Sequence, residues 1–357
     1  MLFNSPKRIL ICPLDWGLGH ATRCIPVIRL LIKKNAEVII AADGRPFELL
    51  KQEFPDLEFV RFEGYDIQYP EKGSMVWKMI LSISKILKGI KAEHQQLDKL
   101  ITDHKIDGVI SDNRYGCWSK KVKSVFVTHQ LMIKTPFAEN ILHKIVLSYI
   151  KKFNECWVPD FEGVNNLSGD LAHKYPLPAN IFYIGPLSRF TKEKTASFEY
   201  DVMAIISGPE PQRSLFEKIM LKQLSKTNLK ALLVEGKTEM EQKIENHGNV
   251  KISSHLRSNE MQDAISRSKI IIARSGYSTI MDLAMLGKRA LFIPTPGQTE
   301  QEYLAELLMQ KNSAYSKSQE KFDLEKALKE SENYKGFDAI GTNNDLEKRI
   351  DLILFSK

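Results

Sequence analysis

The segment from Ile270 to Ile293 constrains the fold of this chain more than any other. A run of branched apolar residues, Ile270–Ala273, is typical of a buried strand and stops at Ser275-Gly276. Apolar residues at helical spacing follow from Tyr277 to Leu286, and a second apolar run comes next. The order strand, small-residue turn, helix, strand predicts a βαβ unit whose turn lies at the carboxyl end of a parallel strand.

The small polar residues of this turn suit it to binding an anion. A helix entered through Ser275-Gly276-Tyr277-Ser278-Thr279 directs backbone N–H groups and two hydroxyls at whatever lies over the turn, which is a suitable geometry for phosphate. Asp282 follows one helical turn later, where a carboxylate can accept hydrogen bonds from ribose hydroxyls. The same residues would also make an ordinary, well-capped βαβ turn.

The chain, with 357 residues, exceeds one typical domain, so we expect two. Two strand–helix series predict Rossmann-like domains at residues 1–187 and 188–340, facing across a cleft, with a last helix in 341–357 that packs back toward the first domain. No run is apolar enough to span a bilayer, no signal peptide is visible, and the four cysteines lack metal-binding spacing. These features predict a reduced, cytoplasmic protein. The net charge of +7 favours anionic partners without choosing among them.

Each half alternates strands with helices, which indicates α/β architecture with doubly wound parallel sheets. Ligands of such sheets gather at the carboxyl ends of the strands. The predicted strands of the first half are Ile9–Pro13, Val38–Ala41, Glu58–Phe62, Gly108–Ser111, Ser124–Thr128 and Cys156–Val158. Those of the second half are Val202–Ile206, Ala231–Glu235, Val250–Ile252, Ile270–Ala273 and Arg289–Ile293.

A glycine turn ending in histidine follows the first strand. The pattern Gly17-Leu18-Gly19-His20 lacks the third glycine of a dinucleotide fingerprint and has no Walker lysine. His20 suits proton transfer, although it could also cap or pack the following helix. Two other strand ends carry polar residues that could share one cleft with this turn, or could serve only as turn formers and backbone partners. These residues are Asp112, Asn113, His129 and Gln130.

Two predicted helices of the first half combine apolar and basic faces. They run from Met75 to Lys91 and from Asn140 to Phe153, and each carries lysines on one stripe. Such helices can lie in an anionic membrane interface, or they can simply cover a sheet with the lysines in solvent. Peripheral contact with the inner face of a membrane is therefore one expectation.

The motifs together resemble the GT-B glycosyltransferases of the MurG type, which move a sugar from a UDP-sugar to an acceptor. Gly17-Leu18-Gly19-His20 resembles the family's glycine-rich turn ending in histidine, and Thr128-His129-Gln130 resembles its later His/Gln segment. Ile184–Arg189 is similar to the hinge motif whose arginine reaches the donor diphosphate. Arg274–Thr279 resembles the turn that holds this diphosphate.

The resemblance implies a site residue by residue. It makes His20 the catalytic base, with Asp15 as a second candidate base or as the group that orients His20. Gly17, Gly19, Asp112, Asn113, His129 and Gln130 fall on the acceptor side. The implied nucleotide-sugar residues are Arg189, Ser207, Gly208, Arg213, His255, Leu256, Arg274, Ser275, Gly276, Tyr277, Ser278, Thr279, Asp282, Gln301 and Glu302.

Two departures from the family pattern bear on the donor. The family's Gly-Gly-Ser loop is replaced by Ser207-Gly208-Pro209-Glu210, which offers fewer N–H donors and brings a carboxylate near the phosphates. Glu302 replaces a glutamine that holds the donor sugar. Both changes bear on the identity of that sugar.

The implied reaction is inverting transfer, without a metal, from a UDP-sugar such as UDP-N-acetylglucosamine to a glycan or a lipid-linked acceptor. Arg189, Arg213 or Arg274 and the helix N-termini at Gly208 and Gly276 would stabilise the leaving diphosphate. No Asp-x-Asp pair stands in a suitable loop, which agrees with catalysis that needs no metal or other cofactor.

Three other interpretations remain open. The turn Gly17–Cys24 also resembles the UDP-sugar hydrolase of pseudaminic acid synthesis, which has the same fold and uses the histidine to activate water. Non-hydrolysing UDP-sugar epimerases have this architecture too, but their motifs find no close match. A non-catalytic binder of nucleotide sugars is a different class. Nucleic acid is not expected as a partner, because the lysines are spread around helices without aromatic interleaving.

Overall fold

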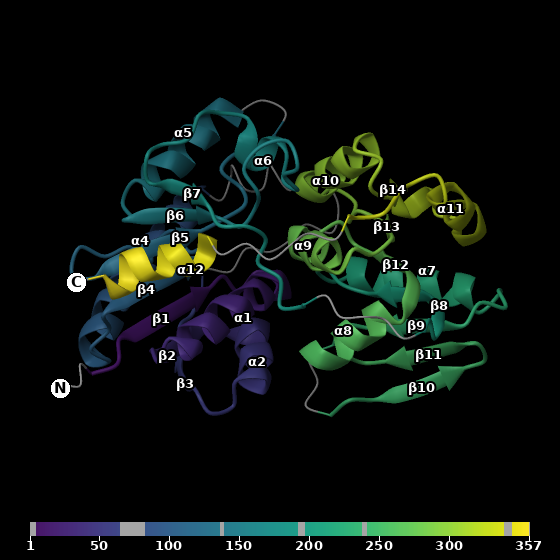
Figure 1. Cartoon of the computed structure of the whole chain (residues 1–357), viewed down its shortest axis with the longest axis horizontal. Helices are drawn as coiled ribbons and strands as arrows, with labels where there is room; N and C mark the ends of the chain where they lie inside the picture. Colours follow the sequence, from purple (N-terminus) through teal and green to yellow (C-terminus); the bar gives the residue numbers. More distant parts are fainter. Residues whose placement is uncertain are drawn as a thin grey trace. The chain divides into compact units, whose positions relative to one another are not determined.

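A computed structural model describes residues 5–64, 83–135, 139–191, 197–237, 241–338 and 345–356. These residues fold into two compact units. The first unit comprises the described residues up to Leu187 together with the C-terminal segment 345–356. The second unit comprises the described residues from Ser188 to 338 (Figure 1).

The first unit is built on a seven-stranded parallel sheet of order β3-β2-β1-β4-β5-β6-β7. Its central strands are buried on both faces, and this explains why they read as continuous apolar runs. The strands are β1 (Arg8–Pro13), β2 (Glu37–Ala42), β3 (Glu58–Arg61), β4 (Gly108–Asp112), β5 (Lys123–Val127), β6 (Glu155–Val158) and β7 (Ile181–Tyr183). The helices are α1 (Leu18–Lys33), α2 (Gly44–Glu53), α4 (Ile83–Asp103), α5 (Glu139–Ile150), α6 (Asp170–His173) and α12 (Asp345–Ile350).

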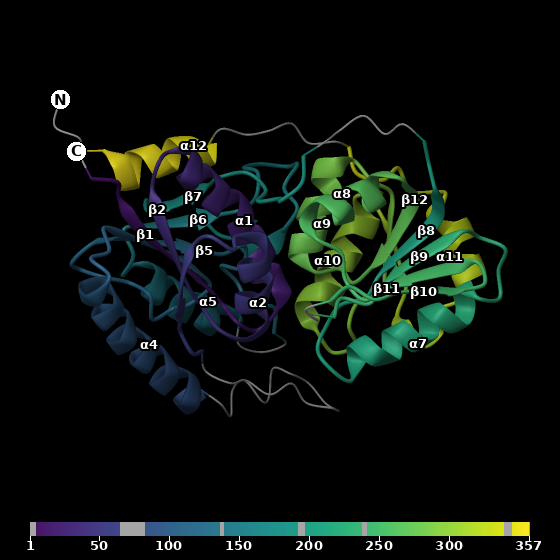
Figure 2. The ribbon, with the colours of Figure 1, turned by 90° about the horizontal axis from the view of Figure 1, so that it is seen from below.

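Helices cover both faces of the first sheet. Leu97, Leu100 and Ile101 of α4 pack with Leu10 and Cys12, which project from one face of β1. A Cβ atom added to Gly108 would lie 2.8 Å from Leu354 Cδ2 and 3.1 Å from Ile9 Cδ1, so the C-terminal segment covers the other face. Figure 2 shows α4 and α12 on opposite sides of this sheet.

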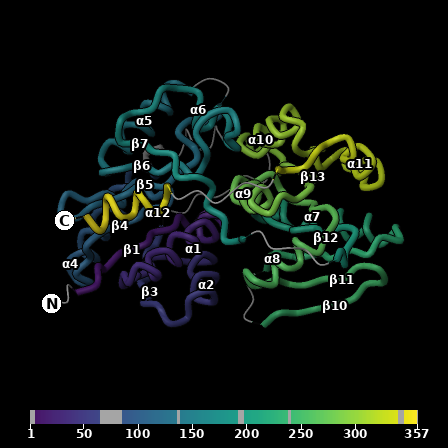
Figure 3. The backbone as a smooth tube through the Cα atoms, in the orientation of Figure 1, coloured from purple at the N-terminus to yellow at the C-terminus, as the bar shows by residue number. Residues whose placement is uncertain are grey.

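The C-terminal segment is tied to the first unit by ion pairs. Lys34 at the end of α1 lies 3.0 Å from Glu347 and 2.8 Å from Asp351. Arg349 pairs with Glu155 of β6, a side chain that also accepts a hydrogen bond from Trp157 Nε1 at 2.7 Å. The tube in Figure 3 shows α12 beside the strands of the first unit. After Ile350 it continues as a single π-helical turn, Asp351–Phe355.

The second unit has its own seven-stranded sheet, of order β10-β11-β9-β8-β12-β13-β14. All neighbours are parallel except β10, which runs antiparallel to β11. The strands are β8 (Tyr200–Ile205), β9 (Ala231–Val234), β10 (Ile244–His247), β11 (Val250–Ser253), β12 (Ser268–Ala273), β13 (Ala290–Phe292) and β14 (Tyr315–Ser316). The helices are α7 (Gln212–Leu224), α8 (Ser258–Ser266), α9 (Tyr277–Leu286), α10 (Thr299–Gln310), the 3-10 turn Gln319–Lys321 and α11 (Leu324–Ser331).

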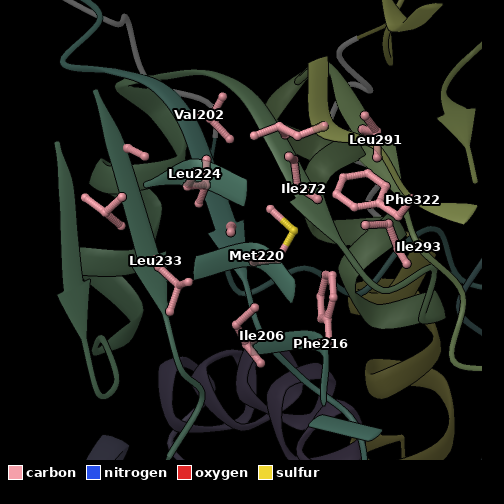
Figure 4. Packing of buried hydrophobic residues seen from close by; sticks show 14 of the residues in the cluster. Val202, Ile206, Phe216, Met220, Leu224, Leu233, Ile272, Leu291, Ile293 and Phe322 are labelled. Atoms are coloured by element: carbon pink, nitrogen blue, oxygen red, sulfur yellow. The ribbon is translucent and has the colours of Figure 1, made fainter. Parts of the chain in front are cut away.

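The core of the second unit forms where α7 and α11 meet one face of this sheet. Phe216, Met220 and Leu224 recur along α7 at intervals of four residues, which puts them on one stripe of the helix. In Figure 4 these side chains point at Ile272 and at other apolar residues of the sheet. Phe322, which directly follows the 3-10 turn Gln319–Lys321, belongs to the same cluster.

The structure confirms the eleven strands predicted from apolar runs, with shifts of one or two residues at their ends. The prediction missed β7, β10 and β14, which are two to four residues long. All four residues of β10 are exposed, so it has no apolar alternation to detect. The helix predicted from Met75 is described only from Ile83, where it extends to Asp103, and the segment 75–82 lies outside the described residues.

Both sheets reverse their winding beside the first strand of the unit. In the first unit β1 lies between β2 and β4, and in the second β8 lies between β9 and β12. At such a switch point the loops that leave two neighbouring strands diverge and leave room for a ligand. The Gly17–His20 turn and Asp112 leave β1 and β4, whereas Ser207 and Ser275 leave β8 and β12. The two predicted glycine turns therefore fall at the two switch points.

Candidate functional site

The first half-site begins with a pairing across the switch point. The last residues of β1 and β4, Pro13 and Asp112, are partners in the parallel register, and Leu14 N donates to Asp112 O at 3.0 Å. Helix α1 starts at Leu18 directly after Gly17, so His20 stands inside its first turn and does not cap it. The start of the helix thereby carries His20 to the end of β4.

His20 and Asp112 form a tight dyad. Nδ1 of His20 lies 2.6 Å from Oδ1 of Asp112, a carboxyl group that is 1% exposed, while the His20 side chain is 19% exposed. Although burial alone would raise the pKa of Asp112, the nearby Arg23 and His20 hold it below its ordinary value. Asp112 is therefore an ionised carboxylate, which accepts the Nδ1–H of His20 and leaves Nε2 as the basic nitrogen.

Arg23 completes this cluster, although the sequence motifs did not mark it as a site residue. Its Nε and Nη2 donate to the two oxygens of Asp112, the latter at 2.5 Å, and its Nη1 lies 2.8 Å from Nδ1 of His129. Arg23 is 1% exposed. Its position three residues after His20, on the same face of α1, is the signal that could have identified it.

Asp15 does not orient His20 in this structure, because Asp112 does. The Asp15 carboxyl lies against Gly64, where an added Cβ atom would come within 2.3 Å of its Oδ2. Its buried Oδ1 has no hydrogen-bond partner among the described residues. The expectation that Asp15 holds the histidine is thus corrected, since the orienting carboxylate comes from the neighbouring strand.

The other acceptor-side candidates occupy the same edge of the sheet. Asn113 has a left-handed backbone with φ 60°, and its buried Oδ1 has no partner in the described part of the chain. Thr128 Oγ1 accepts a hydrogen bond from Gln130 N at 3.1 Å, so the turn after β5 is ordered. Gly17 has an extended backbone, and an added Cβ atom there would meet open space among the described residues. Gly19 contributes its carbonyl to Thr22 Oγ1 at 3.0 Å.

The second half-site is organised by the start of α9. Gly276 precedes the helix with φ −72°, and Ile280 N donates to Gly276 O at 3.0 Å. The N–H groups of Tyr277, Ser278 and Thr279 therefore belong to the positive end of the helix. A Cβ atom added to Gly276 would meet no described atom within 4 Å, so the described residues leave the space over this turn open.

Ser207 and Gly208 leave the neighbouring strand β8, and Gly208 has φ 114°, a conformation that suits only glycine. A Cβ atom at Gly208 would lie 3.6 Å from Thr295 Oγ1. Thr295 is 2% exposed, and its hydroxyl has no hydrogen-bond partner among the residues described. From the sequence this threonine was recognisable only as part of a proline-rich turn.

Arg274 is directed into the protein and not over the turn. Its Nη1 donates to the carbonyl oxygens of Ile293 and Pro294, and its Nη2 donates to Gln212 O and Gln319 Oε1, at 2.6–3.1 Å. Burial lowers the pKa of this arginine to about 10. All four terminal N–H donors are thus used to join three loops, and the geometry gives no support to the expected contact with a diphosphate.

Arg213 is likewise engaged by protein groups. It forms ion pairs with Glu210 and Glu217, both at 2.6 Å, and donates to Glu235 O at 3.2 Å. Two carboxylates therefore neutralise the positive charge that was expected to face the phosphates. The departure from the family loop thus carries Glu210 into direct contact with the arginine.

Arg189 and Asp282 lie together where the second unit begins. The Asp282 carboxyl accepts a hydrogen bond from Ser188 Oγ at 2.6 Å and lies 3.8 Å from Arg189 Nε. Burial raises the pKa of Asp282 to about 6, despite the opposing effect of Arg189. Asp282 therefore links α9 to the first residues of this unit.

The remaining donor-side candidates lie in the loop ahead of α8 and in the first turn of α10. His255 O accepts hydrogen bonds from Ser253 Oγ and Gln242 Nε2, both at 2.8 Å, and His255 and Leu256 are partly exposed ahead of α8. Gln301 uses its side-chain oxygen to accept from Thr295 N at 2.9 Å, and its backbone oxygen accepts from Ser275 Oγ at 2.7 Å. Glu302 accepts from Gly297 N at 3.0 Å. These contacts shape the loop over Ser275.

Neither a metal centre nor a membrane span is found in the described part of the chain. No group of three or more His, Cys, Asp or Glu side chains in the described ranges is arranged to hold a metal ion. Within those same ranges, no helix is both long enough and apolar enough to cross a bilayer.

Comparison with protein families gives one match in each unit. Residues 7–156 match the glycosyl transferase family 1 model. Residues 207–344 match the model of the glycosyltransferase family 28 C-terminal domain. The two matches are separate, and each spans one of the two switch points described above.

Two curated relatives show the same similarity along most of the chain. An uncharacterized glycosyltransferase of Methanosarcina acetivorans is 25% identical over 319 residues, covering 83% of this chain and 81% of the relative. The UDP-N-acetylglucosamine–N-acetylmuramyl-(pentapeptide) pyrophosphoryl-undecaprenol N-acetylglucosamine transferase of Buchnera aphidicola is 24% identical over 325 residues, covering 87% and 84%.

Solved structures show the fold. The glycosyltransferase SnogD from Streptomyces nogalater superposes with a TM-score of 0.63 at 11% identity, covering 99% of this chain and all of the other. MurG of Acinetobacter baumannii superposes with a TM-score of 0.57 at 13% identity, covering 98% and 100%. The chain is accordingly an enzyme of the glycosyltransferase class with the GT-B fold. Within that class it is similar to the glycosyltransferases of the MurG type.

Proposed function

We propose that this enzyme transfers the sugar of a UDP-sugar, with UDP-N-acetylglucosamine as the model donor, to a hydroxyl of a glycan or of a lipid-linked saccharide. The observation that carries the proposal is the contact of His20 Nδ1 with the buried Asp112 carboxylate, which leaves Nε2 of a partly exposed ring as a base. The choice of UDP and of an N-acetylhexosamine rests on the activity named for relatives that are about a quarter identical.

The proposed step is a single displacement. Nε2 of His20 takes the proton of the acceptor hydroxyl while the acceptor oxygen bonds to the anomeric carbon. The bond from that carbon to the diphosphate oxygen breaks, UDP leaves with its electron pair, and the anomeric configuration inverts. Asp112 stabilises the imidazolium that forms, and its buried position keeps the ring in one orientation.

The proposed donor site lies at the switch point of the second unit. The start of α9 would face the diphosphate with its backbone N–H groups, and the open space at Gly276 supports this assignment. We retain Arg189 for the leaving diphosphate because of its place in the hinge motif, and its Nε lies 3.8 Å from Asp282 and its Nη1 3.5 Å from Ser258 Oγ. We further propose that no metal participates, so turnover should be unchanged by EDTA and should not require added Mg²⁺.

An acceptor bound at a membrane is the finer part of the proposal. Helix α5 exposes Ile141 by 64% and Ile145 by 43%, and Lys144 and Lys151 lie on the same stretch of chain. Exposed apolar residues beside lysines suit an anionic lipid surface on the cytoplasmic side. Sedimentation with phosphatidylglycerol vesicles should therefore exceed that with phosphatidylcholine vesicles. The variant I141S/I145S should lose this difference, whereas V164S, at a loop position that is 88% exposed, should keep it.

The deciding experiment is a binding panel followed by a turnover assay. Calorimetry with UDP, GDP, dTDP and CMP and their common sugars should give binding to UDP compounds alone. Release of UDP from the donor should be slow without an acceptor and should accelerate when polyprenyl-linked saccharides are added. Fast and complete release without an acceptor would instead identify the UDP-sugar hydrolase. Absence of binding to every nucleotide would contradict both.

A further inference from the structure

Arg23 lies between two histidines in a buried cluster formed by His20 and Arg23 of α1, Asp112 of β4 and His129 after β5. Arg23 is 1% exposed, Asp112 1% and His129 7%, so water has little access to the contacts between them. An arginine can only donate hydrogen bonds and an ionised aspartate can only accept them. The position of every proton in this cluster therefore follows from the contacts.

The proton on His20 is determined by Asp112. Its Nδ1 lies 2.6 Å from Asp112 Oδ1 and 2.9 Å from Arg23 Nη2. If Nδ1 carried no proton, its lone pair would face the carboxylate oxygen at 2.6 Å, and two acceptors repel at that distance. Nδ1 must therefore carry the proton. Arg23 Nη2 donates its hydrogen bond to Asp112 Oδ1, 2.5 Å away, and not to His20 Nδ1.

The proton on His129 is determined by Arg23. Nδ1 of His129 lies 2.8 Å from Arg23 Nη1, which always carries hydrogen. Nδ1 must therefore be the acceptor, so His129 is neutral and its proton is on Nε2. The two imidazoles that contact one arginine thus have opposite tautomers.

We propose that Arg23 is a positioning residue that makes His20 a neutral base at Nε2 and His129 a neutral hydrogen-bond donor at Nε2. The guanidinium acts through Asp112, because its Nε and Nη2 donate to the two carboxylate oxygens and fix the orientation of this carboxylate. Oδ1 of Asp112 also accepts the Nδ1–H of His20. The guanidinium also opposes a second proton on His20 by charge repulsion. The role in catalysis rests on the proposed function, whereas the tautomers are a property of the folded, substrate-free protein.

The charges around His20 agree with this assignment. Burial and the Arg23 cation lower the pKa of His20, and they outweigh Asp112, which would raise it. A charged His129 would also lower the pKa of His20, but His129 is neutral in this assignment. Without Arg23, the Asp112 charge would act on His20 unopposed by that cation and would raise its pKa.

Nuclear magnetic resonance of the full chain labelled with ¹⁵N-histidine tests the tautomers directly. Long-range ¹H–¹⁵N spectra should show His20 protonated at Nδ1 and His129 protonated at Nε2, with the signals assigned by their loss in H20Q and H129Q. A wild-type spectrum with His20 protonated at Nε2, or with His129 protonated at Nδ1, would overturn the proposal. This measurement needs neither substrate nor an Arg23 variant.

Two Arg23 variants then separate charge from geometry. In R23M the titration midpoint of His20 should rise by about one pH unit, since an adjacent buried cation is lost. In R23K the midpoint should stay near that of wild type, but His129 should show both tautomers, because one ammonium cannot hold Asp112 and His129 together. R29Q removes a cation from an exposed position on the same helix, where Arg29 pairs with Glu53, and should change neither result. An unmoved midpoint in folded R23M, or a single His129 tautomer in R23K, would contradict the role. If R23M does not fold, R23K and the wild-type spectrum decide.

Turnover distinguishes this inference from the proposed function. The acidic limb of kcat/KM should move to higher pH in R23M by the same amount as the His20 titration, which loss of structure alone would not produce. The expected tautomers without any sugar transfer would leave the positioning role intact and contradict the proposed function. Sugar transfer with the opposite tautomers would contradict the positioning role and His20 Nε2 as the base, but not the transferase function.

Discussion

His20 obtains its chemical character from residues that are far away in the sequence. Asp112 follows it by 92 positions and His129 by more than a hundred, yet both belong to one buried cluster with Arg23. The glycine turn predicts that a histidine stands at the end of the first strand. Its orientation depends on the parallel register of β1 and β4, which pairs Pro13 with Asp112.

Replacing His20 by alanine should lower the turnover number by a factor of about 10²–10⁴, the range that a positioned general base contributes. UDP binding, measured by calorimetry, should be unchanged, because the proposed donor residues belong to the second unit. The control is H247A, since His247 is exposed on β10 and should be replaceable without loss of turnover. Turnover of H20A near the wild-type rate would reject His20 as the base.

Asp282 gives a test of stability against pH. Its folded pKa of about 6 exceeds the ordinary value of 3.8, so the folded state holds a proton that the unfolded state has released between these values. The free energy of unfolding therefore falls as the pH rises from about 4 to above 6. D282N lacks this effect, because its amide has no charge to bury.

We expect D282N to gain about 1–3 kcal/mol of stability relative to wild type when the pH is raised from 4 to 7.5, following 1.36 kcal/mol per pKa unit. Urea unfolding followed by far-UV circular dichroism at both values of pH measures the gain. D263N should show no such change, because the Asp263 side chain is 64% exposed. A gain equal at both pH values would argue against a buried, ionisable Asp282.

At the scale of elements, the turn before helix α9 contains a glycine that the fold itself does not require. Gly276 has φ −72°, and an added Cβ atom would meet no described atom within 4 Å. Gly208 differs, because its φ of 114° excludes other residues on backbone grounds. Folding therefore does not explain the glycine before α9, whereas the proposed approach of a diphosphate to this backbone would.

G276A should fold with unchanged or slightly higher stability, by up to about 1 kcal/mol, because alanine suits this backbone and restricts the unfolded chain. Its affinity for UDP should fall at least about tenfold, because the methyl group occupies the space above the first N–H groups of the helix. Thermal unfolding and calorimetry measure the two effects. G17A, a similar change in open space of the first unit, should keep UDP affinity. Undiminished UDP binding by G276A would move the donor away from α9.

At the scale of the molecule, the C-terminal segment 345–356 belongs to the same unit as the described N-terminal residues. Arg349 of α12 pairs with Glu155, which is 8% exposed and also holds the indole N–H of Trp157. Lys34 adds ion pairs to Glu347 and Asp351. The C-terminal segment is thus a structural part of the first unit.

R349Q should lower the stability of the first unit by about 2–4 kcal/mol, because the buried Glu155 carboxylate loses its cation. All four tryptophans precede residue 188, so tryptophan fluorescence during urea unfolding reports on this unit. K348Q changes a side chain that is 69% exposed and should have little effect. Equal stability of R349Q and wild type would show that α12 is not needed by the first sheet.

The fold class could be read from the sequence, because buried parallel strands leave apolar runs and the turns at their ends leave glycine and serine. Ile270–Ala273 followed by Ser275-Gly276 is such a case, and the structure places β12 and α9 there. The short edge strands β7, β10 and β14 leave no comparable pattern. The contacts of the Arg274 side chain could not be predicted either. The motif predicts an arginine beside the phosphate, but not that Nη1 and Nη2 donate to Ile293, Gln212 and Gln319.

By itself the sequence determined the two strand–helix series, the two small-residue turns and the histidine at the first of them, because these depend on local spacing and on residue type. Only the tertiary structure decided which charges meet. Arg23 reaches Asp112 and His129 because β4 and β5 end on the same side of the sheet as α1 begins. Arg349 meets Glu155, 194 positions away in the sequence, for the same reason. Charge pairing depends on distances of a few ångströms, and those distances are set by strand register and helix packing.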